Sequence, residues 1–336
     1  MGAAAFGVAA VATAGLWTAG PASAQGVTGS AYQVQRLPVL PGTTRSEATA
    51  MDPSGHWIGG EVDTADGAAH PVLWHDGVLT ELSGIPLADA QIAAVGAGGF
   101  AAGSGFADGG HSRAFMISGG GYFELPLPAG AVSASASGVS AHGDVAGMVT
   151  FADGTRRPVV WPGDRFGTVR ELRLPAGYAG SAVGMSADGT AVVQADLNFD
   201  QFRSFVFSAR GVRTELRPAT RGAQAVVQAV ADGYAIGFQF DPASGTSSTV
   251  RWNLRTHTAR VVPLLTSTSA VNSHGTYGGQ SVDGTATLVS ARGRVIDLPV
   301  LAGNRASSVN GLAGDGSAAG FARDAAGTVT AVRWTR

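Results

Sequence analysis

The chain has 336 residues, of which 45% are hydrophobic and 14% are charged, and it contains no cysteine. Its 22 basic residues are all arginine and face 24 acidic residues, so the net charge is −2. This composition excludes intrinsic disorder, disulfide bonds, a thiol nucleophile and a Schiff-base lysine. Without a basic excess to neutralise phosphates, nucleic acid is not expected as a partner.

An uncharged run of mostly small and apolar residues covers positions 2–24 and ends in Ala22-Ser23-Ala24. An apolar segment followed by an A-x-A site is typical of a secretory signal peptide, which predicts residues 1–24 as a signal, cleavage before Gln25 and a secreted protein. No basic residue precedes the run, so either the true start lies upstream or the signal is a poor one. The competing interpretation is an uncleaved membrane anchor, because about 20 apolar residues can span a bilayer.

After this segment the chain repeats itself. A glycine turn recurs at intervals of 41 to 46 residues, at Gly55, Gly99, Gly143, Gly189, Gly233, Gly275 and Gly316. A short strand rich in glycine or alanine follows each turn, and only 191–193 (Ala-Val-Val) departs from this rule. A second turn then centres on aspartate, at Asp66, Asp108, Asp153, Asp200, Asp241, Asp283 and Asp324.

The second half of each repeat is also regular. A third strand ends in a large side chain, at Trp74, Phe115, Trp161, Phe207, Trp252, Trp334 and, as the weakest member, Leu288. A fourth strand often closes the unit with Leu-Pro, as at 125–126, 174–175 and 298–299. Four short strands every 40 to 45 or so residues, with hardly any helical periodicity, are typical of propeller blades. The large side chains are expected to be buried between neighbouring blades.

The two ends of the chain complement each other. The seventh repeat starts at Ser307 and stops at Arg336 after three strands, whereas residues 32–40 form a Leu-Pro strand with no blade of its own. Pairing that strand with 307–336 removes two open sheet edges, which otherwise favour aggregation. The sequence therefore predicts one all-β domain over 25–336, a seven-bladed β-propeller of four-stranded antiparallel blades, whose last blade the N-terminal strand closes. A monomer is expected.

The segment His111-Ser112-Arg113-Ala114-Phe115, followed one strand later by Leu125-Pro126, resembles the HAF class of bacterial extracellular repeats. The resemblance covers residues 31–336, although copies such as 71–74 and 158–161 keep the tryptophan and lose Ala-Phe. It implies an exported propeller and no activity common to the class. WD40 repeats share the period, but their Gly-His signature is missing here.

The histidines do not form a metal motif in the sequence. His142 and His274 occupy the turn position that aspartate holds in other repeats, which favours a role in the turn. His70 and His75 are five residues apart on one strand, so their side chains leave opposite faces and cannot bind one ion. His56, His111 and His257 have no counterparts in other repeats. No metal ligand and no cofactor-binding residue is assigned.

Two sets of carboxylates recur with the repeat. The aspartates of the second turn point to one face of the disc, where they could suggest calcium, but Asp-Gly is also the expected hairpin dipeptide and a turn-forming role is favoured. Glu81, Glu124, Glu171 and Glu215 precede a leucine in four closing strands. A side chain placed identically in several blades supports the sheet, whereas a catalytic pair breaks the repeat. No catalytic residue is assigned.

Function is expected in loops that depart from the repeat, around the mouth of the channel. The two candidates are 161–167 (Trp-Pro-Gly-Asp-Arg-Phe-Gly) and 198–203 (Asn-Phe-Asp-Gln-Phe-Arg), whose aromatic and polar groups suit sugar or peptide recognition. We interpret the chain as a secreted, non-catalytic scaffold that binds an extracellular glycan or protein without a cofactor. The alternative is a propeller hydrolase or lyase acting on polysaccharide, which requires a cluster of acidic, histidine or arginine side chains in the channel.

Overall fold

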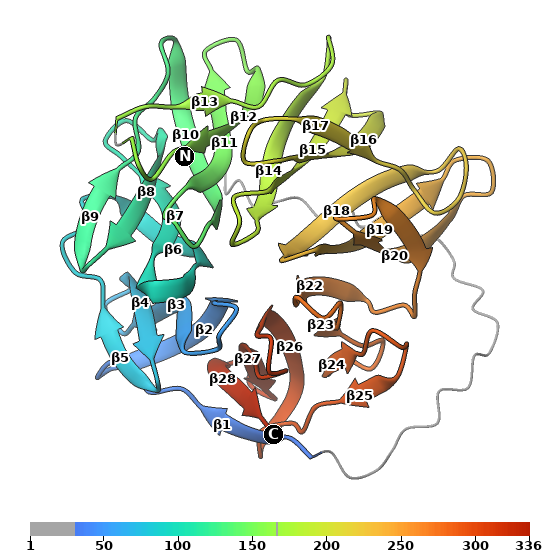
Figure 1. Cartoon of the computed structure of the whole chain (residues 1–336). Helices are drawn as coiled ribbons and strands as arrows, with labels where there is room; N and C mark the ends of the chain where they lie inside the picture. Colours follow the sequence, from blue (N-terminus) through green and yellow to red (C-terminus); the bar gives the residue numbers. More distant parts are fainter. Residues whose placement is uncertain (1–30, 166) are drawn as a thin grey trace.

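The computed structural model describes residues 31–165 and 167–336, so the predicted signal segment lies outside the described residues. Within them, seven four-stranded antiparallel sheets surround a central axis, and each sheet is one blade of a propeller (Figure 1). The only helical element in this part of the chain is a short 3-10 turn, Ala97–Gly99. The predicted fold is confirmed.

Each blade runs from an innermost strand to an outermost one. Blade 1 holds β2 (Thr43–Met51), β3 (Trp57–Thr64), β4 (Ala69–His75) and β5 (Val78–Glu81). Blade 2 holds β6 (Ala88–Val95), β7 (Ala101–Phe106), β8 (Ser112–Ser118) and β9 (Gly121–Glu124). Blade 3 holds β10 (Ala131–Val139), β11 (Val145–Phe151), β12 (Arg156–Trp161) and β13 (Arg170–Glu171). Blade 4 holds β14 (Ala179–Met185), β15 (Ala191–Leu197), β16 (Gln201–Phe207) and β17 (Arg213–Leu216).

The remaining blades have the same order. Blade 5 holds β18 (Gln224–Ala231), β19 (Tyr234–Asp241), β20 (Thr246–Asn253) and β21 (Thr258–Val261). Blade 6 holds β22 (Ser267–Val271), β23 (Tyr277–Gln280), β24 (Ala286–Val289) and β25 (Val295–Asp297). Blade 7 holds β26 (Asn304–Leu312), β27 (Ala318–Asp324), β28 (Val329–Thr335) and, from the other end of the chain, β1 (Gln33–Arg36).

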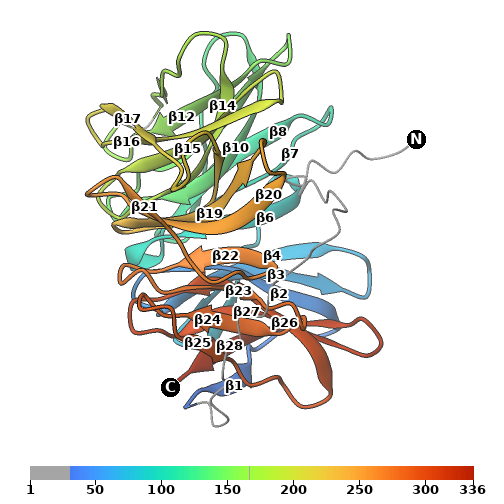
Figure 2. The same cartoon turned by 90° about the vertical axis from the view of Figure 1, so that its right-hand side faces the viewer.

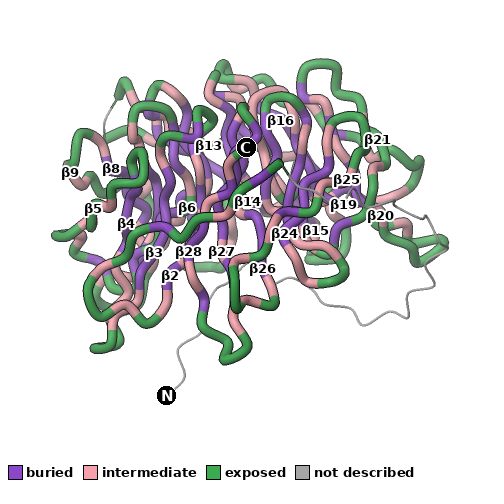
Figure 3. The backbone as a smooth tube through the Cα atoms, turned by 90° about the horizontal axis from the view of Figure 1, so that it is seen from below, coloured by how far each residue is buried: buried purple, intermediate pink, exposed green. Residues whose placement is uncertain are grey.

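The strands cross the thickness of the disc, so the turns gather on its two faces (Figure 2). We call the face that carries the turns between first and second strands, and between third and fourth strands, the first-turn face. The opposite face, with the turns between second and third strands and the connections between blades, is the second-turn face. Burial follows this division, because the strands are mostly buried while the turns are exposed (Figure 3).

The ring is closed by β1, as the sequence predicts. This strand pairs antiparallel with β28, and Gln33 lies opposite Thr335 while Arg36 lies opposite Val332. Beyond the strand, the backbone N–H of Leu37 donates to the carbonyl of Ala331 over 3.0 Å. The pairing covers the outer edge of β28, which otherwise exposes unpaired backbone groups.

The large side chains of the third strands are buried between blades, and the tryptophans also bond across the interface. Each of the four indole Nε1 atoms donates to a carbonyl just after the fourth strand of the preceding blade. The pairs are Trp74 with Pro38 (2.7 Å), Trp161 with Pro126 (2.8 Å), Trp252 with Arg217 (2.8 Å) and Trp334 with Pro299 (2.9 Å). In three of the four pairs the acceptor is the proline of a Leu-Pro ending, so these endings supply acceptors for the following blade.

A glycine on the second strand makes room for this ring. A Cβ built on Gly147 lies 2.0 Å from the carbonyl oxygen of Ser135 and 2.8 Å from the Trp161 ring. Gly60 has the same relation to Trp74 in blade 1. These glycines on the second strand therefore leave the space that the tryptophan ring of the same blade occupies.

Pairing with these glycines refines the register of the repeat. Gly103 lies opposite Phe115 and Gly279 opposite Thr287, whereas Gly147 lies opposite Val159, two residues before Trp161. In blade 3 the tryptophan comes two residues after the glycine's partner. By the same count, Ile117 follows Phe115 in blade 2 and Val289 follows Thr287 in blade 6. Ile117 and Val289, rather than Phe115 and Leu288, therefore occupy the tryptophan position. All four side chains are buried, so the composition of the strands does not reveal the shift.

A β-bulge interrupts every innermost strand at one equivalent residue. The skipped residues are Thr49, Ala93, Ser137, Val183, Gln228, Ser269 and Asn310. A bulge bends the strand and re-aims a side chain. The spacing of residues in the sequence does not predict this bulge. Within the described residues, no helix is long and apolar enough to cross a membrane.

Candidate functional site

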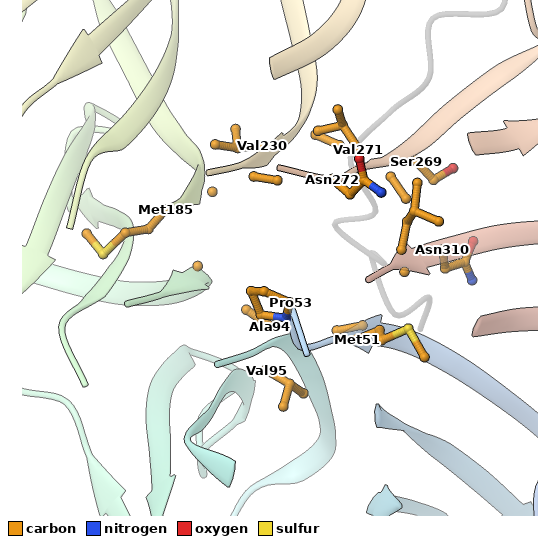
Figure 4. Close-up of a pocket in the computed structure, with 18 of the residues that line it drawn as sticks. Met51, Pro53, Ala94, Val95, Met185, Val230, Ser269, Val271, Asn272 and Asn310 are labelled. Carbon is orange, nitrogen blue, oxygen red and sulfur yellow. The ribbon is translucent and has the colours of Figure 1, made fainter. Parts of the chain in front are cut away.

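The central channel widens into a cavity of about 230 Å³ toward the first-turn face, lined by the ends of the innermost strands of all seven blades. Met51, Met185, Val230, Val271 and Asn272 lie around it (Figure 4). The lining consists of small, aliphatic and uncharged polar residues together with one carboxylate, that of Asp232. Among the described residues, neither the acidic or basic cluster that an enzyme needs nor the aromatic lining of a binding channel is present here.

Four polar residues at the bulges, Thr49, Ser137, Gln228 and Asn310, are engaged in bonds between neighbouring blades. These bonds run from Thr49 Oγ1 to the Ile92 carbonyl (2.6 Å), from Ser137 Oγ to the Ala182 carbonyl (2.7 Å), from Asn310 Nδ2 to the Ala48 carbonyl (3.0 Å), and from Thr268 Oγ1 to Gln228 Oε1. They join blades 1 and 2, 3 and 4, 7 and 1, and 5 and 6. The bulge thus turns an inner side chain toward the next blade and fastens the ring near its axis.

Two further polar side chains of the cavity act in the same way. The carboxylate of Asp232 accepts a hydrogen bond from the backbone N–H of Ala187 in the preceding blade over 2.6 Å. The amide of Asn272 donates to the carbonyl of Ala313 in the following blade over 2.9 Å. The polar atoms of the channel therefore hold blades together, and we look for a ligand site elsewhere.

Four aspartates of the second turns, Asp66, Asp153, Asp241 and Asp324, bond within those turns, as predicted. Asp153 accepts a hydrogen bond from the backbone N–H of Thr155 (2.8 Å), and Asp324 accepts from those of Ala326 and Thr328 (both 2.9 Å). Such bonds to the ionised form lower the pKa of Asp66, Asp153 and Asp241. The described residues contain no group of three or more His, Cys, Asp or Glu side chains placed to hold a metal ion.

The glutamates of the fourth strands form a repeated pair with the third strand. Each lies close to a basic side chain near the start of that strand: Glu81 to His70 (2.8 Å), Glu124 to Arg113 (3.5 Å), Glu171 to Arg157 (3.2 Å) and Glu215 to Arg203 (3.8 Å). All four glutamates are exposed. The four glutamates therefore make equivalent pairs between the third and fourth strands, and their supporting role in the sheet stays a prediction.

The histidines are spread over several blades, and only His56 and His75 contact a common residue, Asp76, within the described part of the chain. His142 and His274 are exposed in first turns, where their backbone N–H groups donate to Ser140 Oγ and Asn272 Oδ1. His70 bonds Glu81, whereas His75 stacks on Trp57 with the ring centroids 3.9 Å apart. The spacing rule for the last two is confirmed.

One contact between histidine and aspartate could not be predicted from spacing. The Nδ1 atom of His56 lies 2.5 Å from Oδ1 of Asp76, and Nε2 of His75 lies 3.4 Å from Oδ2 of the same carboxylate. Asp76 stands in the turn after β4 with a φ of 49°, and its N–H donates to the His56 carbonyl. Asp76-Gly77 reads as an ordinary hairpin turn in the sequence, so no signal there identifies its partners.

The candidate loop 161–167 lines a second pocket, of about 400 Å³, between blades 2 and 3. Met116, Phe123, Leu125 and Trp161 are among its walls. It shares no lining residue with the channel, so the loop lies away from the channel mouth, in contrast to the expectation. Phe166 of this loop lies outside the described residues.

The other candidate loop, 198–203, presents an aromatic side chain to solvent on the second-turn face. Phe199 is 75% exposed, and it stands with Asn198 in a left-handed turn, with φ values of 60° and 53°. A left-handed backbone is unfavourable for a bulky residue. An exposed phenyl ring in such a turn departs from every other repeat.

The Phe199 ring is held from the neighbouring blade. The guanidinium of Arg156 in blade 3 lies 4.9 Å from the ring centroid and donates to the buried carboxylate of Asp196 over 2.6 Å. The other oxygen of Asp196 accepts the N–H of Phe199. Beside them, Arg203 lies 5.5 Å from the ring of Tyr178. We call Arg156, Tyr178, Asp196, Phe199 and Arg203 the Phe199 patch.

Comparison with known proteins shows the fold. No family model and no curated protein matches the chain. Among solved structures it is similar to an oligogalacturonate lyase in complex with manganese, with a TM-score of 0.58 and 13% identity over 93% of this chain and 95% of that one. It is also similar to the β-propeller domain of the Trilobed protease from Pyrococcus furiosus, with a TM-score of 0.56 and 9% identity over 86% of this chain and 95% of that one.

A third similar structure comes from a study of two prolyl endopeptidases, with a TM-score of 0.57 and 12% identity over 88% of this chain. This chain spans 51% of that protein's length. The Pyrococcus domain has an open velcro topology, whereas here β1 closes the last blade. At these identities the likeness establishes that the chain is a β-propeller, which is the identity that the fold and the comparisons support together.

Proposed function

We propose that the chain is a secreted, non-catalytic propeller of the HAF class that binds an extracellular glycan or protein through the Phe199 patch. The observation that carries the proposal is the exposed Phe199 ring in a left-handed turn, supported by an arginine of the preceding blade. The site is therefore on the second-turn face at the boundary of blades 3 and 4, rather than at the channel.

The energetics of the turn support a binding role. A left-handed backbone conformation costs a non-glycine residue about 1 to 2 kcal/mol, and the apolar ring gains no burial in return. Strain of this kind is found at sites where a particular side chain must be presented. Asp196 compensates part of the strain by accepting the Phe199 N–H.

The chemistry of the patch fits a ligand with a flat or apolar face. Aromatic rings and arginine are the residue types that contribute most binding energy at interfaces. Because Arg156 is already paired with Asp196, it supplies an oriented planar surface and free N–H donors without an uncompensated charge. A sugar ring or an apolar peptide side chain of the ligand stacks on such a surface. Hydroxyl or carbonyl groups of the same ligand accept hydrogen bonds from the arginine.

The test is binding of the purified chain without residues 1–24 to glycan and peptide arrays. Phe199→Ala is expected to reduce binding at least about tenfold, because it removes the stacking surface. Phe240→Ala is the matched control, since Phe240 is a partly exposed phenylalanine (38%) at the same end of the second strand in blade 5. Equal binding by both variants contradicts the assignment of the patch.

The non-catalytic part of the proposal has its own test. The same preparation is incubated with a panel of neutral and acidic polysaccharides, and new reducing ends and unsaturated products are measured. We expect no turnover. Product formation that survives repurification contradicts the proposal and favours the hydrolase or lyase alternative.

Secretion is tested independently of the ligand. When the full chain is expressed in a bacterial host, we expect the protein in the medium with an N-terminus at Gln25. Protein retained in the membrane fraction with residues 1–24 intact contradicts the signal-peptide interpretation and supports an anchor.

A further inference from the structure

Charge is divided unevenly around the ring. Residues 31–155 and 156–336 each contain 12 acidic residues, but the first part contains 3 of the 22 arginines and the second part contains 19. The first part forms blades 1 and 2 and the first half of blade 3. Blades 1 and 2 lie on one side of the ring, and blades 4 and 5 lie on the other (Figure 1). The small net charge is therefore the sum of an acidic side and an arginine-rich side.

Four arginines lie together at the outer rim of blades 3 and 4, and we call them the arginine rim. Arg170 begins β13 and Arg173 follows that strand, while Arg213 begins β17 and Arg210 stands in the turn before it. The Nη1 atom of Arg213 donates to the carbonyl of Arg173 over 2.8 Å. A Cβ built on Gly211, the residue after Arg210, lies 2.7 Å from the Nη1 atom of Arg170. These two contacts across the blade boundary hold the four residues in one place.

The charges of the arginine rim are not neutralised within the chain. No ion pair of the described residues involves any of its four members, and all except Arg170 are exposed. The glutamates of the same outer strands, Glu171 and Glu215, lie against Arg157 and Arg203 instead. Like charges that are held close to each other repel, so a negatively charged partner stabilises this surface.

Blades 1 and 2 carry the complementary charge on the second-turn face. Their two arginines, Arg45 and Arg113, both lie against carboxylates of their own blade. The carboxylates of Asp66, Asp89 and Asp108 are exposed and form no ion pair within the described part of the chain. We call the exposed carboxylates at this end of the two blades the acidic surface, which consists of Asp66, Glu81, Asp89, Asp108 and Glu124.

We propose that copies of this chain associate head to tail, with the arginine rim of one copy against the acidic surface of the next. The two surfaces belong to different blades, so the contact is heterologous and each copy keeps one surface free for a further copy. A net charge of only −2 gives little repulsion between copies, and the opposite charges decide their orientation. Because the contact joins exposed charges, salt weakens it, and the monomer expected from the sequence is the state at high ionic strength.

The association is independent of the proposed function. The arginine rim and the Phe199 patch both lie at blades 3 and 4, but they share no residue. The two arginines of the patch already lie against carboxylates, those of Asp196 and Glu215. Phe199→Ala is therefore expected to associate like the wild type, so failure of this proposal and failure of the Phe199 patch are distinguishable.

Sedimentation velocity of the chain without residues 1–24 measures the association. At about 20 mM salt we expect the weight-average sedimentation coefficient to rise with protein concentration. At about 500 mM salt we expect it to be independent of concentration, because the screening length falls to a few ångströms. Pairing between open sheet edges uses backbone hydrogen bonds and does not depend on salt in this way, so the two kinds of association are distinguishable.

Charge-reversal variants identify the two surfaces. The rim variant combines Arg173→Glu with Arg210→Glu, and the acidic-surface variant combines Asp108→Arg with Glu124→Arg. Each variant alone loses the attraction at the contact, so its dissociation constant at low salt should rise at least about tenfold. In an equal mixture, the unchanged acidic surface of the rim variant meets the unchanged arginine rim of the acidic-surface variant. We therefore expect a 1:1 complex and no larger species.

The matched control combines Arg292→Glu with Arg305→Glu. These exposed arginines of blades 6 and 7 form no ion pair among the described residues, and their reversal changes the net charge as much as the rim variant does. The control is expected to associate more strongly than the rim variant. Circular dichroism checks that each variant is folded. If Glu124→Arg prevents folding, Asp108→Arg alone represents the acidic surface.

Four results overturn the proposal. The first is a wild-type sedimentation coefficient that does not depend on concentration at low salt, and the second is an association that persists unchanged at high salt. The third is an equal loss of association in the control and the rim variant, and the fourth is a mixture of the two variants that forms no complex. Polygalacturonate is added in a separate arm. If the wild type stays monomeric at low salt but binds this polyanion through the arginine rim, the partner is an acidic glycan and the proposal is wrong.

Discussion

The phenol of Tyr277 donates a hydrogen bond to the carbonyl oxygen of Pro263, 2.6 Å away, and so joins blade 6 to blade 5. In blades 1, 3, 5 and 7 a tryptophan on the third strand makes this bond, whereas Tyr277 reaches the same kind of acceptor from the second strand, opposite Val289. Burial raises the pKa of Tyr277, which keeps the phenol protonated as a donor. Tyrosine and tryptophan thus make the same kind of hydrogen bond, from a ring donor to a carbonyl of the preceding blade.

Tyr277→Phe tests the worth of this bond. The substitution keeps the ring but removes the hydrogen bond to the carbonyl of Pro263, an exposed residue, and such a bond contributes about 0.5 to 1.5 kcal/mol. We expect the free energy of unfolding to fall by that amount in urea titrations. An unchanged midpoint shows that water replaces the phenol.

Trp161→Ala is expected to lower the free energy of unfolding by about 3 to 5 kcal/mol, the range typical of a large buried aromatic. Trp161 is 2% exposed and also donates to Pro126. Trp161→Phe keeps most of the packing and loses the hydrogen bond, so its effect should be smaller. Denaturant unfolding of the two variants measures the difference, and an equal, small effect of both contradicts the assigned register.

Two glycine substitutions separate crowding from backbone strain. Gly147→Ala places a Cβ 2.0 Å from the Ser135 carbonyl oxygen, so the strands must move apart, and we expect a loss of about 3 kcal/mol or more. Gly284→Ala has no atom within 4 Å but a φ of 79°, so only strain of about 1 to 2 kcal/mol is expected. Thermal unfolding of both variants checks the order, and the reverse order contradicts the ring-packing role of Gly147.

Removal of residues 1–40 tests the closure of the ring. It deletes β1 and exposes the edge of β28, so we expect a less stable chain that associates through this edge. Removal of residues 1–30 is the control, because it leaves β1 in place. Light scattering after size-exclusion chromatography distinguishes the two. If the chain without residues 1–40 is a stable monomer, the closing strand is dispensable and the expectation is wrong.

The pair of His56 and Asp76 predicts a specific dependence on pH. The hydrogen bond between them raises the pKa of His56 above 6.5 and lowers that of Asp76 below 3.8. The contribution of His56 is therefore complete below pH 6.5 and is lost as the pH rises through its raised pKa. That of Asp76 is complete above pH 3.8 and is lost as the pH falls through its lowered pKa.

The pair is therefore fully formed between about pH 4 and 6.5. An NMR titration of the His56 imidazole checks this assignment. Asp76→Asn is expected to return the pKa of His56 toward 6.5, because the opposing carboxylate is removed. Asp153→Asn, in a second turn, is the control and should leave the titration unchanged. A His56 pKa that is the same in all three proteins contradicts the contact.

The sequence by itself determined the fold, the number of blades and the strand that closes the ring. These follow from local signals: alternation within strands, glycine and aspartate in turns, and a repeat that begins at one terminus and ends at the other. The same signals predicted the turn role of Asp153 and the supporting role of Glu171, because a role repeated in each blade is visible as a repeated residue.

Only the tertiary structure decided where the blades touch and which surface groups meet. The bulge that aims Thr49 at the next blade and the meeting of His56 with Asp76 both join residues of different turns or blades. Their positions depend on strand register and blade rotation, which the periodicity of one repeat does not encode. Phe199 was found as a candidate from its sequence, but its exposure depends on a left-handed turn and on Arg156 of another blade.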